Sequence, residues 1–271
     1  MEPNFCLDRL WAVFPKQPVF PKAAIDVAEG LEFLHSRNVV HCDLKPRNVL
    51  VSNKHYACPD VNRDQFEDLF GVEPVVCKLT DFGLSHCRLL QTSVIIHAQT
   101  SNVERRTKPY MAPEILLERR KITTATLEDT KAIDVWAFGM TLLSIINPDT
   151  TFPFEIELKS IFPTAANGPA RFQSLLQEKM EGKLKPSSPR KYHRLQASLW
   201  INTEETFKRC TNYDASLRPS AQEVLQQLKA SNAKGSTGKL ISLKVSQSTP
   251  IKEADKQFAE PMEQGTSKAV K

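Results

Sequence analysis

The feature that most constrains this chain is a short segment, His41 to Leu50, that reads His-Cys-Asp-Leu-Lys-Pro-Arg-Asn-Val-Leu. Asp43 can accept a proton, Lys45 carries a compact positive charge, and Asn48 offers an oxygen that suits a hard cation. An isolated Asp-Leu-Lys is more often a solvated surface tripeptide. The pattern His-x-Asp-Leu-Lys-Pro-x-Asn, however, fixes six residue types, and its frequency by chance is on the order of one in 10⁵ to 10⁶ chains of this length. The segment therefore predicts a chemical site.

Two further motifs follow in the same chain. Asp81-Phe82-Gly83 supplies another carboxylate and a glycine that lets the backbone turn sharply, and Met111-Ala112-Pro113-Glu114 comes next. A lone Asp-Phe-Gly is an ordinary turn. Three motifs in this order are not a coincidence.

Together the motifs resemble the catalytic loop, the metal-binding loop and the substrate-loop anchor of eukaryotic protein kinases. The resemblance implies that Asp43 accepts the proton of the substrate hydroxyl and that Lys45 contacts the transferring phosphate of ATP. It implies that Asn48 and Asp81 hold Mg²⁺. It also implies that Leu50 forms the apolar floor of the adenine site, although core packing explains Leu50 equally well.

Other positions extend the resemblance. Thr107 falls where serine/threonine kinases place a threonine that hydrogen-bonds the catalytic Asp and Lys, so it joins Asp43 and Lys45 as a catalytic candidate. With Lys45 in the catalytic loop, this implies Ser/Thr rather than Tyr specificity.

The resemblance also implies long-range contacts. Asp134 matches the residue of a buried helix that holds the catalytic-loop backbone. Glu114 and Arg218 match a structural ion pair, for which unrelated surface charges are the alternative. His41 and Phe82 match side chains that pack beneath the adenine site.

Hydrophobic periodicity and capping residues predict helices and short strands. The apolar run 133–146 is hydrophobic nearly all round, which is typical of a buried helix. Ser220 and Glu223 suit the start of the last helix. The predicted helices are 23–35, 133–146, 198–210 and 221–229, and the predicted strands are 49–51 and 75–79, with a polar insertion at 52–74 between them.

One residue departs from the family pattern, because Cys42 stands where an arginine usually precedes the catalytic Asp. Arginine there pairs with a phosphate on the activation loop, and cysteine cannot. We therefore expect that phosphorylation would not switch the loop in the usual way at Thr92, Ser93, Thr100 or Ser101. A second hypothesis, oxidant sensing by Cys42, is weaker, because a neighbouring carboxylate raises a thiol pKa.

The sequence before the catalytic loop is short. It contains no glycine-rich loop and no strand lysine; Met1-Glu2-Pro3, Leu7 and Leu10 resemble a hinge and the first helix of the large lobe. The expected fold is mainly α with short β hairpins, a kinase-like C-terminal lobe without the β-rich small lobe. Its apolar face toward that lobe is a possible partner surface.

Composition bounds the remaining classes. The expected kinase domain is 1–229, and 230–271, with seven lysines against four acids, is expected to be a disordered basic tail. The body then carries too little of the net charge of +5 for a nucleic-acid surface. No apolar run is long enough for a membrane span, there is no signal-peptide pattern, and the cysteines show no paired spacing, so a cytoplasmic protein is expected.

Two functional hypotheses remain. The first is a protein serine/threonine kinase that transfers phosphate from ATP, with Mg²⁺, to hydroxyls of a protein substrate, impaired in this chain by the missing lobe. The second is a non-catalytic kinase lobe that binds or regulates a partner.

Overall fold

The computed structural model describes residues 4–9, 19–52, 75–87, 108–117, 126–147, 150, 152–155, 157, 176, 178, 181, 185–186 and 197–236. Residue contacts divide the chain into one unit, Met1–Lys239, and a second, Leu240–Lys271, which lies outside the described residues. Most of the predicted insertion at 52–74 also lies outside them.

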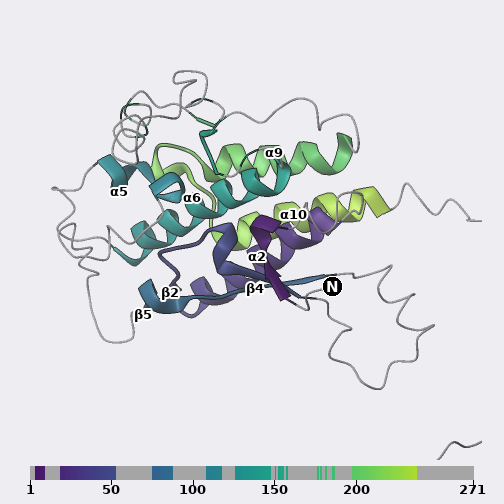
Figure 1. Cartoon of the computed structure of the whole chain (residues 1–271), viewed down its shortest axis with the longest axis horizontal. Coiled ribbons are helices and arrows are strands. Elements are labelled where there is room, and N and C mark those ends of the chain that lie inside the picture. The colour runs from purple at the N-terminus through teal and green to yellow at the C-terminus, as the bar shows by residue number, and fades with distance from the viewer. Residues whose placement is uncertain are drawn as a thin grey trace, which may run out of the picture. The chain divides into compact units, whose positions relative to one another are not determined.

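Long helices build most of the described structure (Figure 1). Helix α2 packs against α10 and α6, while α9 packs against both α6 and α10. A short helix, α5, follows the Met-Ala-Pro motif. The bounds are α2 Val19–Ser36, α5 Pro113–Leu117, α6 Leu127–Ile146, α9 Ala197–Cys210 and α10 Ala221–Ser236.

The two polar motifs lie in connections between short antiparallel strands. One sheet has three strands in the order β1-β3-β4, and β2 pairs with β5 in a second sheet. The segment 41–48 connects β2 to β3, and 80–85 connects β4 to β5. Because β3 pairs with β4 and β2 with β5, the sheets bring both connections to one place. The bounds are β1 Asn4–Cys6, β2 Val39–Val40, β3 Val49–Ser52, β4 Val76–Leu79 and β5 His86–Cys87.

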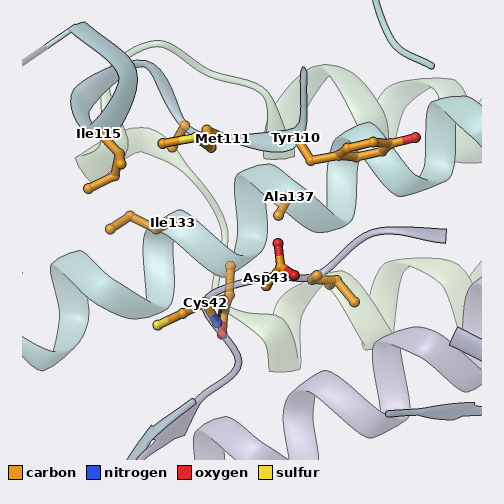
Figure 2. Close-up of a pocket in the computed structure, with 10 residues that line it drawn as sticks. Cys42, Asp43, Tyr110, Met111, Ile115, Ile133 and Ala137 are labelled. Carbon is orange, nitrogen blue, oxygen red and sulfur yellow. Dashed lines mark hydrogen bonds between the residues drawn. The ribbon is translucent and has the colours of Figure 1, made fainter. Parts of the chain in front are cut away.

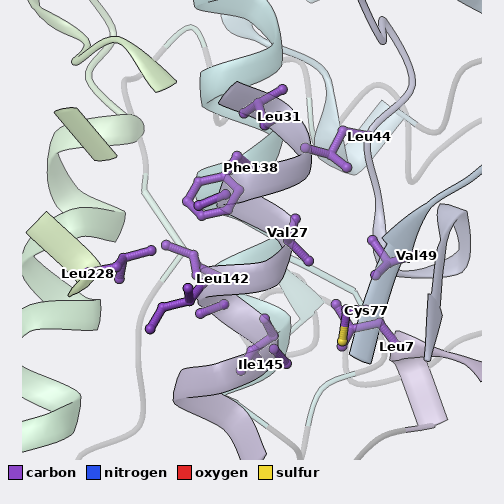
Figure 3. Packing of buried hydrophobic residues seen from close by; sticks show 14 of the residues in the cluster. Leu7, Val27, Leu31, Leu44, Val49, Cys77, Phe138, Leu142, Ile145 and Leu228 are labelled. Atoms are coloured by element: carbon purple, nitrogen blue, oxygen red, sulfur yellow. The ribbon is translucent and has the colours of Figure 1, made fainter. Parts of the chain in front are cut away.

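Helix α6 lies between two hydrophobic clusters, which explains why its sequence is apolar nearly all round. Phe138, Leu142 and Ile145 pack into a cluster with α2, α10 and the β3–β4 strands (Figure 3). Trp136 and Met140 belong to a second cluster, with the residues around Met111 and α9. The prediction of a buried helix here is correct. The described fold is mainly helical with few strands, as expected.

The predicted helix ends were less accurate. Helix α6 begins at Leu127 rather than Ile133, because Thr126 and Asp129 form a reciprocal capping box within a polar stretch. Helix α2 begins four residues before Ala23, with Pro21 in its first turn, where a missing N–H costs nothing. Helix α10 runs past the predicted end at Lys229 to Ser236, so the expected start of the tail at residue 230 falls inside a helix. The sequence from Ala221 to Lys234 contains no glycine or proline that would end the helix earlier.

The contact between α6 and α9 depends on a glycine. A Cβ added to Gly139 would lie 2.7 Å from Cγ2 of Thr211 and 2.9 Å from Cβ of Cys210. Because both neighbours are buried, we expect Gly139→Ala to lower the free energy of unfolding by about 1–3 kcal/mol. Urea denaturation of the full chain measures this.

Gly30→Ala is the matched control. It gains the same helix propensity, about 1 kcal/mol, and its nearest contacts are side-chain atoms of Leu79, at 3.0 and 3.2 Å. Leu79 is only partly buried and can move, so we expect a smaller effect. Equal stability of the two variants would contradict the close-packing argument.

Candidate active site

The segment 41–48 is anchored by a buried carboxylate of α6. Asp134 is 1% exposed, and its Oδ2 and Oδ1 accept hydrogen bonds from the backbone N–H groups of His41 and Cys42, at 2.6 and 2.8 Å. Nε2 of His35, on α2, lies 3.1 Å from Oδ2. Because a buried carboxylate is costly unless its oxygens are satisfied, these contacts fix the start of the loop on the helix core. The predicted role of Asp134 is confirmed.

Asp43 lies at the centre of a compact polar cluster. Lys45 donates from Nζ to Oδ2 of Asp43 at 2.7 Å. Nδ2 of Asn48 donates to the backbone oxygen of Asp43 at 2.8 Å and to its Oδ2 at 3.1 Å. The structure therefore brings together Asp43, Lys45 and Asn48, with the carboxylate held from two sides.

The orientation of Asn48 suits a cation. Its Nδ2 is engaged by Asp43, and no donor among the described residues reaches its Oδ1, which leaves that oxygen as a ligand for a hard ion. The backbone oxygen of Asn48 accepts from the N–H of Thr80 at 2.9 Å. Asp81, the next residue, is exposed. The donor set of Asn48 and Asp81, an amide and a carboxylate oxygen, fits the chemistry of Mg²⁺.

His41 joins the two loops. Its ring lies 5.2 Å from that of Phe82, between centroids. Its Nε2 is 3.0 Å from the backbone oxygen of Thr80, and its own backbone oxygen accepts from Ser85 Oγ at 3.2 Å. The predicted contact between His41 and Phe82 is confirmed. Phe82 nevertheless remains 48% exposed.

Leu50 lies on the face of β3 opposite the core. Val49 and Val51 are fully buried, whereas Leu50 is half-buried between them. This alternation favours a surface role for Leu50 over plain core packing. Its proposed contact with adenine stays a prediction. Thr107 lies outside the described residues, as do Thr92, Ser93, Thr100 and Ser101.

A small pocket lies beside Asp43, between the catalytic loop, the segment 110–115 and α6 (Figure 2). Cys42 and Asp43 line one side, Tyr110 and Met111 another, and Ile133 a third. Cys42 is 7% exposed and adopts a left-handed backbone, with φ 64°. The residue that replaces arginine is therefore a buried thiol, and oxidant sensing there stays an untested hypothesis.

The segment 111–114 is held from its other side by Arg218. Nη1 and Nη2 of Arg218 donate to the two oxygens of Glu114 at 2.6 and 2.8 Å. Arg218 also donates to the backbone oxygens of Ala132, at 2.9 Å, and Asn212, at 2.8 Å. The predicted ion pair is confirmed. It ties the segment beside the pocket to the start of α6 and to the turn before α10.

Comparison with known proteins agrees with this geometry. A sequence model of the protein kinase domain matches residues 12–228. The chain belongs to the protein kinase family.

The curated proteins that resemble this chain include serine/threonine kinases. The chain is 25% identical to "Serine/threonine-protein kinase STY46" of Arabidopsis thaliana, over 79% of this chain and 27% of that protein. It is 28% identical to "G-type lectin S-receptor-like serine/threonine-protein kinase SD2-5" of the same plant, over 76% of this chain and 21% of that protein. What the chain shares with them is the protein kinase domain. The chain spans about a quarter of the length of these relatives.

Two supporting residues of the kinase site were missed in the sequence. His35 ends the predicted helix 23–35 and contacts Asp134, 99 positions away. Thr80 connects the two loops through its backbone. A neighbouring motif could have suggested Thr80, whereas nothing local indicates the partner of His35. No helix among the described residues is long and apolar enough to cross a membrane.

Removing the charge of Asp134 tests the anchor. In Asp134→Asn, the amide nitrogen would face an N–H donor of His41 or Cys42, which leaves a buried donor unsatisfied. We expect a loss of at least about 2 kcal/mol in the free energy of unfolding. Hydrogen exchange of a peptide that covers residues 39–44 should accelerate.

Asp129→Asn, on the same helix, is the control. Asp129 is exposed and serves only the capping box in the described structure, so we expect a loss of no more than about 1 kcal/mol and unchanged exchange at 39–44. Unchanged exchange in Asp134→Asn would refute the anchoring role.

Proposed function

We propose that the described site transfers the γ-phosphoryl group of ATP to a Ser or Thr hydroxyl of a protein substrate. The observation that carries this proposal is the cluster of Asp43, Lys45 and Asn48, fixed on Asp134 and joined through Thr80 to the segment of Asp81. In phosphoryl transfer, positioning and charge supply most of the catalysis. Each residue type in this cluster has a role in that task.

Asp43 orients the substrate hydroxyl and takes its proton as the new P–O bond forms and the bond to the leaving ADP oxygen breaks. Lys45, held at 2.7 Å from Asp43, places a positive charge near the transferred group. Asn48 and Asp81 would hold Mg²⁺, which when bound neutralises phosphate charge. Leu50 is proposed to contact adenine, and Thr107 to bond Asp43 and Lys45.

The wider assignments are also proposals. We assign the kinase domain to residues 1–229 and a separate basic segment to 230–271, with the qualification that α10 continues to Ser236. We propose a cytoplasmic protein whose partners include a protein substrate. The exposed Phe82 and the half-buried Leu50 support a partner surface above β3 and the Asp-Phe-Gly motif.

Asp43→Asn tests the function. Loss of the carboxylate should lower phosphate transfer from labelled ATP to an array of Ser- and Thr-containing peptides by about 10²- to 10⁴-fold. The readout is the ratio of the variant's rate to the parent's rate. Asp214→Asn is the matched control, since Asp214 is exposed, caps the short helix Ala215–Leu217, and asparagine caps equally well.

A parent chain without transfer, or one with transfer that Asp43→Asn preserves, would contradict the proposal. The first result would favour the alternative, a kinase lobe that acts through binding. Asp81→Asn tests the cation site separately from the catalytic base. We expect this variant to lose Mg²⁺-dependent nucleotide binding, which thermal shift measures.

A further inference from the structure

We infer that Arg47 forms a subsite for an acidic side chain of the protein substrate. The inference rests on the proposed function for the place where the substrate binds. It deepens that function, since it assigns a substrate class, peptides with Asp or Glu close to the acceptor hydroxyl.

Arg47 projects into solvent from the catalytic loop itself. Its side chain is 81% exposed, while Pro46 and Asn48 on either side are buried. The three residues form a short 3-10 turn, closed by the backbone bond from Asn48 N–H to Lys45 O at 2.9 Å. Asn48 also holds Asp43. The guanidinium therefore starts from the same rigid turn that positions the catalytic carboxylate.

The hydrogen-bonding capacity of Arg47 is largely unused. Its Nε donates to Oδ2 of Asp8 at 3.1 Å, and its two terminal nitrogens donate to no residue in the described part of the chain. A guanidinium presents a planar fork that matches a carboxylate with two parallel bonds. Lys45, by contrast, is engaged by Asp43. Arg47 is thus the cation of this loop that can bind a second carboxylate.

The bond to Asp8 does not block such a ligand. Asp8 lies on the 3-10 turn Leu7–Arg9, which contacts the turn of Arg47. Exposed ion pairs contribute only about 0–1 kcal/mol, so a substrate carboxylate can share Arg47 with Asp8 or replace it. Asp8 should therefore act as a weak competitor.

The position of Arg47 relative to the pocket beside Asp43 supports the same conclusion. Tyr110 lines that pocket and approaches Ser144, with 3.4 Å between the hydroxyl oxygens. Burial is the main reason that the pKa of Tyr110 is raised to about 12; among the smaller contributions, the hydrogen bond of Ser144 and the charge of Arg47 lower the pKa and the charge of Asp8 raises it. The turn that carries Asp8 contacts helix α6, which Tyr110 also approaches at Ser144, so the Asp8–Arg47 pair lies on the Tyr110 side of the pocket. An extended peptide advances about 3.3 Å per residue, so an acidic residue a few positions from the acceptor can reach it.

The experiment uses peptides with one serine and a single Glu moved through the flanking positions, together with matched Ala and Lys peptides. Binding to the full chain is measured without ATP by fluorescence anisotropy, and phosphorylation is measured separately with ATP and Mg²⁺. We expect the best Glu peptide to bind about three- to tenfold more tightly than its Ala counterpart. The advantage should shrink as salt is added.

Two variants should shift this Glu-to-Ala ratio in opposite directions. Arg47→Glu should lower the Glu-to-Ala binding ratio below one and make the Lys peptide the tightest binder. Asp8→Asn should raise the ratio about two- to threefold, because the competitor is removed. Lys229→Glu is the control for total charge. Lys229 is exposed, pairs with Glu29 of α2, and its replacement should leave the ratio unchanged.

The outcomes separate the subsite from the proposed function. A parent ratio near one, a ratio unaffected by Arg47→Glu, or an equal response to Lys229→Glu would overturn the subsite. Arg47-dependent binding of acidic peptides without any phosphate transfer would uphold the subsite and contradict the kinase activity. Transfer without a preference for acidic peptides would uphold the kinase activity and overturn the subsite.

Discussion

The site depends on one buried carboxylate. Asp134 accepts hydrogen bonds from two successive backbone N–H groups, those of His41 and Cys42, and lies within 3.1 Å of the His35 ring. Burying a charge costs far more than burying a neutral group unless donors surround it. Asp134 therefore has one low-energy arrangement, and in that arrangement the catalytic loop has one position. Helix α6 can supply this fixed point because it packs against both hydrophobic clusters.

Two residues in these loops have strained backbone conformations, and each lies next to a contact that holds its loop in place. Cys42 and Asp81 both have positive φ, 64° and 62°, although neither is glycine. Such conformations cost of order 1–3 kcal/mol each and persist only when the surroundings impose them. At Cys42 the N–H bond to Asp134 does so. At Asp81, the preceding residue, Thr80, is bonded to Asn48 and His41. The sharp turns at both positions set the direction in which Asp43 and Asp81 leave the backbone.

Sequence reasoning succeeded where one motif carries its own geometry. The short motifs predicted that Asp43, Lys45 and Asn48 act together, and resemblance to a known family supplied the distant partners Asp134 and Arg218. Helix ends failed for a physical reason, since a capping box such as that of Thr126 lies in a stretch whose polarity otherwise indicates a loop. Leu50 was ambiguous in the sequence because both faces of a short strand can be apolar, and only the burial of its neighbours distinguishes them.

The pair of Asp8 and Arg47 could not be predicted, because 39 positions separate them and neither lies in a distinctive pattern. The pair nevertheless shows where the positive charge of the catalytic loop reaches the surface. Position 42 holds a buried thiol, so the loop has no interior cation that could pair with a phosphate there. Its cations are Lys45, engaged by the carboxylate of Asp43, and Arg47, exposed at the surface. The exposed positive charge of this loop therefore lies at Arg47 and not at position 42. Under the proposed subsite, this is the charge that an acidic peptide would meet.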